Sequence, residues 1–591
     1  MKSYNIYISL FFALCLMSCN DFLDRIPLDE VSNESYWNSE NDMKVYNNEI
    51  YTLAADCEKT GIMIAHGNGG WVTSSWMLDQ MSDNLASISD RSIFYTDIRS
   101  GLRVVPTKPE FYDYQGWEFL RSVNFGLENY DRTPIEQNIK NKYIAEARLF
   151  RGWFYGVKVE HYGDVQWINK ALKTDSPELF MKRDAREVVM DSVLLDLNFA
   201  TTYLPSDWGD GNAPGRLNRW GALLIKARIC LFEGTFRKYH GISDYERWIS
   251  EAKDAAYELM TQGPYSLYQT NNPIMNEDYA WIHKQNDLSG NPEVMYWRRY
   301  TDGINTHNAY QYFSDISGGA TRSMVESYLC ADGLPISQSP LYQGDEQLED
   351  VFTNRDPRLR QSILDPDDKE ARRFYAGDIL DYPRLLGMTG GRISTTGYHV
   401  IKQYDADKIT STVNTSQQAG IILRFGEALL IYAEATAELG DLTQNDLDIS
   451  INLLRSRVNM PAMDINNIPI DPMAAEEGVS PLIYEIRRER RVELFCEGFR
   501  YEDLMRWKLG RYLAEPAYGM LWDEKAKERF SEANLVQSSV DPLDGKEYID
   551  VYKGTQWENA VFDENKDYLW PIPLSLQTEN SEVGQNPGWD K

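Results

Sequence analysis

Residues 141–161 read NKYIAEARLFRGWFYGVKVEH, and this stretch decides the fold class. Its apolar side chains recur at every third or fourth position, which is the period of an amphipathic helix. Gly163 follows closely and predicts the end of that helix. The apolar positions that define the period are Ile144, Ala147, Phe150, Phe154 and Val157.

The same helical period recurs along the chain on the C-terminal side. Gly241 lies between two such segments and predicts a helical hairpin, and Gly440 ends another helix. These helix pairs are similar to tetratricopeptide units, but no period of about 34 residues runs through the chain. Ordinary antiparallel helix pairs therefore stay open as an alternative. We expect helices over residues 184–204, 217–237, 245–260, 423–439, 447–458 and 481–495.

Two aromatic-rich segments, 66–125 and 263–320, lie between the helical blocks. Each contains ten aromatic residues interleaved with Gly, Asn, Ser and Asp. An exposed Trp or Tyr can cover the apolar face of a sugar ring while polar neighbours bond its hydroxyl edges. Core packing explains any single ring equally well. The candidate platforms are Trp71, Trp76, Trp281 and Tyr300, and the candidate edge partners are Asp79, Asp83 and Asn84.

The N-terminal sequence, MKSYNIYISLFFALCLMSCN, predicts that the protein is exported and attached to a membrane. Its apolar run is too short to span a bilayer and is typical of a secretory signal over residues 1–18. Leu16-Met17-Ser18-Cys19 resembles a bacterial lipobox, which predicts acylation of Cys19. Two or more acyl chains anchor a protein stably. No later stretch reaches 18 apolar residues, so we expect a lipid-anchored surface protein.

Charge and residue composition disfavour several classes of partner and metal site. With 90 acidic and 60 basic residues, the net charge is −30, which disfavours nucleic acid as a partner. The cysteines after Cys19 show no CxxC spacing, and the six histidines form no HExxH motif, so no zinc site is expected. Acidic turns at 207–212 and 365–368 could hold Ca²⁺ through oxygen ligands, but neither has EF-hand spacing. We expect no cofactor and no metal.

Catalysis by paired carboxylates is also disfavoured. A glycosidase holds two carboxyl groups roughly 5–10 Å apart in a cleft. The chain has many carboxylates, but no alternating strand–helix series indicates a barrel that would place such a pair. We expect a binding protein and not an enzyme.

An ordered series of motifs resembles the SusD/RagB family of outer-membrane nutrient-binding lipoproteins. Two positions depart from the family's usual pattern: Gly426 stands where the family commonly has Ala, and Phe499 where His is more frequent. We interpret both as packing positions. The series runs from residue 19 to residue 589. Its members are CNDFLDRIPLDE (19–30), IAEARLFRGWFYGVKVEHYGDV (144–165), YLCADG (328–333), NRDPRL (354–359), TGY (396–398), LRFGEALL (423–430), YAEA (432–435), RERRVEL (488–494), EGFRYEDL (497–504), RW (506–507), LWPIP (569–573) and QNPGW (585–589).

The resemblance implies a mostly α-helical fold in which tetratricopeptide-like helix pairs pack against an irregular, loop-rich ligand-binding region. It implies one domain over residues 19–591, with an N-terminal half at 19–262 and a C-terminal half at 263–591. The implied function is capture of oligosaccharides and their delivery to a SusC-type TonB-dependent transporter in the outer membrane. A peptide-capturing, RagB-like partner of such a transporter is the alternative.

Overall fold

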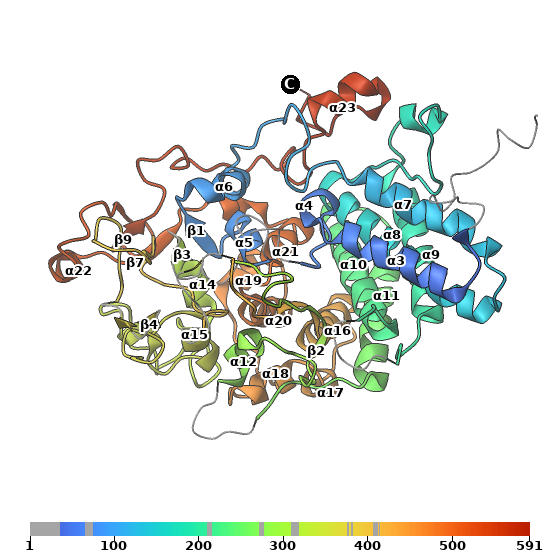
Figure 1. Cartoon of the computed structure of the whole chain (residues 1–591). Coiled ribbons are helices and arrows are strands. Elements are labelled where there is room, and N and C mark those ends of the chain that lie inside the picture. The colour runs from blue at the N-terminus through green and yellow to red at the C-terminus, as the bar shows by residue number, and fades with distance from the viewer. Residues whose placement is uncertain are drawn as a thin grey trace, which may run out of the picture.

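The computed structural model describes residues 36–65, 75–209, 215–270, 277–308, 318–374, 378–379, 382–405, 412 and 414–590. Helices dominate it, and the strands are short and scattered (Figure 1). The predicted mostly α-helical fold is confirmed. No helix in these described ranges is long and apolar enough to cross a membrane.

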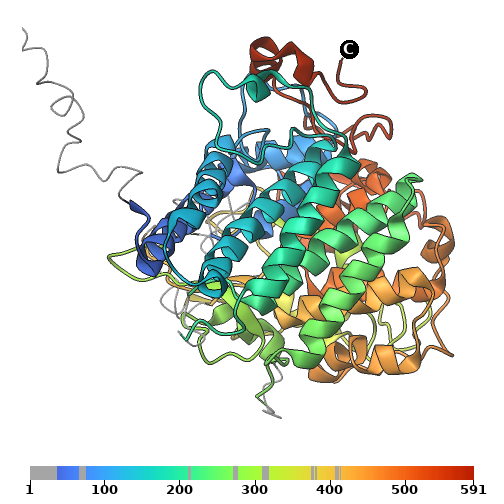
Figure 2. The ribbon, with the colours of Figure 1, turned by 90° about the vertical axis from the view of Figure 1, so that its right-hand side faces the viewer.

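The N-terminal part is a layer of long helices that lie side by side (Figure 2). The predicted helix at 141–161 is α8, which begins four residues earlier and ends before Gly163. The predicted hairpin is α10 and α11; Asn218 caps α10 at its start and Gly241, at φ 73°, ends it. The layer consists of α3 (Glu40–Ala54), α7 (Trp117–Asn129), α8 (Gln137–Tyr162), α9 (Arg186–Tyr203), α10 (Arg219–His240) and α11 (Tyr245–Gln262).

A second helical group follows from residue 425. Its central helix α16 is buried along nearly its whole length and packs against both α11 and α20, so it connects the two groups. The predicted helix at 447–458 is split into two, because Ser450 takes a non-helical conformation at φ −135° and ψ −95°. The group consists of α16 (Phe425–Leu439), α17 (Gln444–Asp448), α18 (Ile451–Arg457), α19 (Pro472–Glu476), α20 (Pro481–Glu493) and α21 (Arg500–Arg506).

Short antiparallel strands join segments that are far apart in sequence. Pairing of β1 with β3 and of β2 with β6 brings residues near 86 to 319 and residues near 296 to 423. A three-stranded sheet, ordered β7-β9-β8, lies in the C-terminal part. The strands are β1 (Leu85–Ser87), β2 (Val294–Arg298), β3 (Gly318–Ala320), β4 (Arg373–Phe374), β5 (Asp378–Ile379), β6 (Gly420–Arg424), β7 (Tyr518–Leu521), β8 (Ser538–Val540) and β9 (Glu547–Asp550).

Short helices fill the remainder and set the positions of several candidate residues. Figure 1 places α5 and α12 between the N-terminal layer and the C-terminal strands. These helices are α4 (Cys57–Thr60), α5 (Ser75–Leu78), α6 (Ile93–Arg99), α12 (Asp278–Trp281), α14 (Arg322–Ser327), α15 (Pro357–Ser362), α22 (Glu524–Arg529) and α23 (Leu574–Glu579).

The corner between α20 and α21, residues 481–506, is held by buried ion pairs. Asp503 contacts Arg490 at 2.9 Å and Arg506 at 2.8 Å, and all three side chains are buried. Glu485 and Arg488 also pair, at 3.1 Å. Because these charges are buried with opposite partners, they hold the two helices together.

Glu493 is the most heavily paired carboxylate at this corner. Its oxygens lie 2.6 Å from Arg457, 2.9 Å from Arg424 and 3.0 Å from Arg358. Burial alone would raise the pKa of Glu493, but the three guanidinium groups hold it well below its usual value. Three separate segments of the chain therefore converge on one carboxylate.

Candidate functional site

Trp281 is the candidate platform whose ring is most open to solvent among the described residues. It ends α12 and is 44% exposed. Asp278 at the start of α12 accepts hydrogen bonds from the backbone N–H and the hydroxyl of Thr270, at 2.7 and 2.6 Å. Nearby in sequence, Asp287 and Arg299 form an exposed ion pair. The α12 surface therefore presents a half-exposed aromatic ring, and the exposed carboxylate of Asp287 follows it six residues along the chain.

Two other candidate platforms are buried, so the expectation that they expose their rings is corrected. Trp76 is 4% exposed within the main hydrophobic core, and Tyr300 is 5% exposed and packs edge-on against His307. Helix α5, which carries Trp76, lies directly against Gly498: a Cβ there would meet the Ser75 carbonyl oxygen at 2.7 Å. This close approach packs the start of α5 against the turn before α21.

The three candidate edge partners are buried too, and they join α5 to the α20–α21 corner. Asp83 accepts two hydrogen bonds from Arg500, at 2.8 and 2.9 Å, and pairs with Arg491 at 3.0 Å. Burial would raise the pKa of Asp83, but these two cations hold it well below its usual value. Asn84 accepts from Arg491 at 2.8 Å.

Asp79 differs from Asp83 because no cation among the described residues contacts it. It accepts hydrogen bonds from the backbone N–H of Cys496 at 2.6 Å and from Asn84 at 3.3 Å. Burial raises the pKa of Asp79 to about 7, against the lowering effect of those two hydrogen bonds. All three side chains are buried, so none of them lies at the rim of an open site.

Several candidates fall outside the described residues. These are Cys19, Trp71 and part of the acidic turn at 207–212. In the other acidic turn, Asp365 and Asp368 accept hydrogen bonds from backbone N–H groups of the turn itself. Within the described ranges, no three His, Cys, Asp or Glu side chains gather in a way that could hold a metal.

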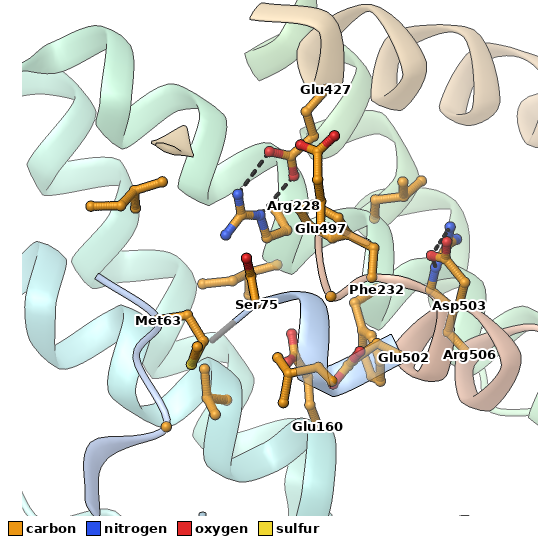
Figure 3. Close-up of a pocket in the computed structure, with 18 of the residues that line it drawn as sticks. Met63, Ser75, Glu160, Arg228, Phe232, Glu427, Glu497, Glu502, Asp503 and Arg506 are labelled. Atoms are coloured by element: carbon orange, nitrogen blue, oxygen red, sulfur yellow. Dashed lines mark hydrogen bonds and ion pairs between the residues drawn. The ribbon is translucent and has the colours of Figure 1, made fainter. Parts of the chain in front are cut away.

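A cavity of about 150 Å³ lies between the N-terminal layer and the α20–α21 corner. Figure 3 shows Arg228 of α10 and Glu427 of α16 on one side of it, and Glu160 of α8 and Glu502 of α21 on the other. Arg228 and Glu427 form two hydrogen bonds of 2.7 Å each. The apolar part of the lining includes Met63, Leu78, Val157, Ile229 and Phe232.

Glu160 and Glu502 form the acidic end of the cavity. Among the described residues Glu160 has no ion pair, and Glu502 has only the neutral ring of His161 at 3.8 Å. Burial raises the pKa of Glu160 to about 7, although Arg228 and Arg186 oppose the shift. Burial, and then the neighbouring Glu160, raise the pKa of Glu502 well above its usual value.

This cavity was not predicted from the sequence. One signal was available: Glu160 lies three residues after Val157, so it continues the apolar face of the 141–161 helix. A carboxylate on a core-facing stripe is unusual and marks a polar feature inside the protein. The contribution of α21 could not be seen, because it depends on how distant helices pack.

Antiparallel helices form the scaffold, an irregular region with short strands packs on it, and an exposed aromatic ring lies on α12. The profile of the SusD family matches residues 244–589, which is more than half of the chain. The chain therefore belongs to the SusD family.

Individual relatives agree with this assignment. The chain is 22% identical over 488 residues to SusD-like protein P2 of Formosa agariphila, covering 80% of this chain and 79% of that protein. A SusD-like carbohydrate binding protein from Bacteroides fragilis superposes with a TM-score of 0.70 at 21% identity, over 93% of this chain and all of the other. A laminarin binding SusD-like protein superposes with a TM-score of 0.56 at 17% identity, over 94% and 100%.

Proposed function

We propose that this protein captures oligosaccharides or polysaccharide at the cell surface and delivers them to a SusC-type TonB-dependent transporter. The observation that carries the proposal is membership of the SusD family, together with a fold match along almost the whole chain to a carbohydrate-binding protein. The alternative of peptide capture has no observation in its favour beyond the net charge of −30, which would suit a basic peptide.

The ligand contacts that we propose centre on Trp281 and Trp71. An indole ring covers the apolar C–H face of a sugar, and each such contact contributes about 0.5–1.5 kcal/mol beyond the area buried. Asp287 and Arg299 are exposed by about half, so their charged groups are accessible to the hydroxyl groups of a ligand. A few contacts of this size suit reversible capture, followed by release to a transporter.

We propose that bound glycan is not cleaved. The paired carboxylates of the α20–α21 corner are each neutralised by arginine, so they are not poised as an acid and a base. Incubating the protein with a glycan that it binds should release no more reducing ends than a heat-denatured control. Release above that control would contradict this part of the proposal.

We propose that acylated Cys19 anchors the protein to the outer membrane. Replacing Cys19 with Ala should move the protein from the membrane fraction to the soluble fraction after a salt wash. A variant that stays in the outer membrane would show that another feature holds it there. Co-purification of the wild-type protein with an outer-membrane transporter tests the proposed partner.

The experiment that tests the capture function is affinity electrophoresis through gels that contain single polysaccharides, run beside gels that contain casein peptides. We expect retardation by at least one polysaccharide and none by the peptides. Retardation by the peptides alone would replace glycan capture with peptide capture.

A further inference from the structure

The two carboxyl groups at the acidic end of the cavity differ from the other carboxyl groups of its lining, because each of the others is paired with an arginine. Glu427 is paired with Arg228, Glu497 with Arg424, and Asp503 with Arg490. Glu160 and Glu502 have no cationic partner among the described residues, and one oxygen of Glu502 is buried with no hydrogen-bond donor. An ammonium ion placed between these two carboxyl groups would favour their charged forms and supply the cationic partner that the described residues do not.

One further acceptor in the lining lacks a donor. The side-chain oxygen of Gln403 has no hydrogen-bond partner among the described residues, although Gln403 is only 4% exposed. This oxygen is available to an N–H or O–H group of a ligand.

The rest of the lining suits an organic body rather than a bare metal ion. Met63, Val157 and Ile229 contribute apolar surface, and Phe232 contributes an aromatic ring that can face a cation. A divalent metal would need more oxygen or nitrogen ligands than two carboxylates. A cavity of about 150 Å³ has room for a molecule of roughly the size of benzene.

We propose that this cavity binds a small organic ammonium ion, with its charged group at Glu160 and Glu502 and its carbon chain against Val157 and Ile229. A hydroxyl group on the ligand would also accept from Nη1 of Arg490, a buried donor of the lining that has no partner among the described residues. Trp281, Asp287 and Arg299 do not line this cavity, so the test of this proposal does not depend on glycan capture.

Calorimetric titration of the full chain with ethylammonium and with ethanolammonium tests the proposal. Both probes should bind, and the hydroxyl of ethanolammonium should make its binding several-fold tighter. Glu160→Gln and Glu502→Gln should each weaken binding of both at least tenfold. Glu187→Gln removes an exposed carboxylate from α9 and should leave binding unchanged.

Thermal melts provide a second test of binding, which still applies if a substitution changes the stability of the protein. Each probe should raise the melting temperature of the wild-type protein and of Glu187→Gln, and should leave that of a folded Glu160→Gln, Glu502→Gln double variant unchanged. Equal shifts in wild-type and double variant would place the ammonium ions elsewhere on this acidic protein. No binding of either probe to the wild-type protein would also overturn the proposal.

Discussion

The α20–α21 corner and the acidic end of the cavity both bury carboxyl groups, yet the fold treats them in opposite ways. At the corner, Glu493 meets three guanidinium groups and its pKa falls. At the cavity, Glu160 and Glu502 meet no cation among the described residues and their pKa values rise. Carboxyl groups that are paired with cations stabilise the fold. Carboxyl groups without a cationic partner are candidates for binding a ligand.

The largest effect should come from breaking the corner. Glu493→Gln would leave Arg424, Arg457 and Arg358 without their shared carboxylate, and removing one side of a buried ion pair costs about 3–5 kcal/mol. Urea unfolding should show that loss in the free energy of unfolding. A loss below about 1 kcal/mol would mean that the corner does not depend on this carboxylate.

Acid should weaken the corner through Glu497 by a slightly smaller amount. Burial would raise the pKa of Glu497, but Arg424 and Lys402 lower it to about 2 from an ordinary 4.5. A depressed pKa adds stability above about pH 4.5 that is lost as the pH falls towards 2. At neutral pH this amounts to about 3 kcal/mol.

Comparison of the wild-type protein with Glu497→Gln at several pH values checks this expectation. The difference in their free energies of unfolding should shrink as the pH falls below about 4.5. A difference that stays constant between pH 7 and pH 3 would show that the Glu497 pairing contributes nothing that depends on ionisation.

At the cavity, the stability of the protein should depend on pH with the opposite sign. The pKa of Glu160 is raised to about 7, so its contribution is fully present below about pH 4.5 and is lost as the pH rises through 7. Glu160→Gln keeps the shape without the charge and should stabilise the protein by about 3 kcal/mol at pH 8. Thermal melts at pH 5 and pH 8 should show the gain only at the higher pH. Destabilisation at pH 8 would mean that the carboxylate has a cationic partner.

Much of the scaffold could be predicted from the sequence. The helix bounds followed from apolar periods and glycine stops, as α8 and α10 show. The break between α17 and α18 was missed, because the same residues fit one continuous helical period on either side of Ser450.

The candidate site could be predicted less well. Trp76 and Trp281 lie in similar aromatic-rich sequences, yet one is 4% exposed and the other 44%. The difference arises because α5 packs against the turn at Gly498, a contact between residues more than 400 positions apart. Local composition carries no information about such a contact, so it cannot separate a core ring from a surface ring.

The central claim is that glycan is held on an open aromatic ring which the scaffold does not need. Calorimetric titration of Trp281→Ala and Trp76→Ala with a polysaccharide that the wild-type protein binds tests it directly, with a thermal melt of each. We predict that Trp281→Ala weakens binding about tenfold, or 1.4 kcal/mol, at an unchanged melting temperature. Trp76→Ala should lower the melting temperature instead. Unchanged affinity in Trp281→Ala would contradict the claim.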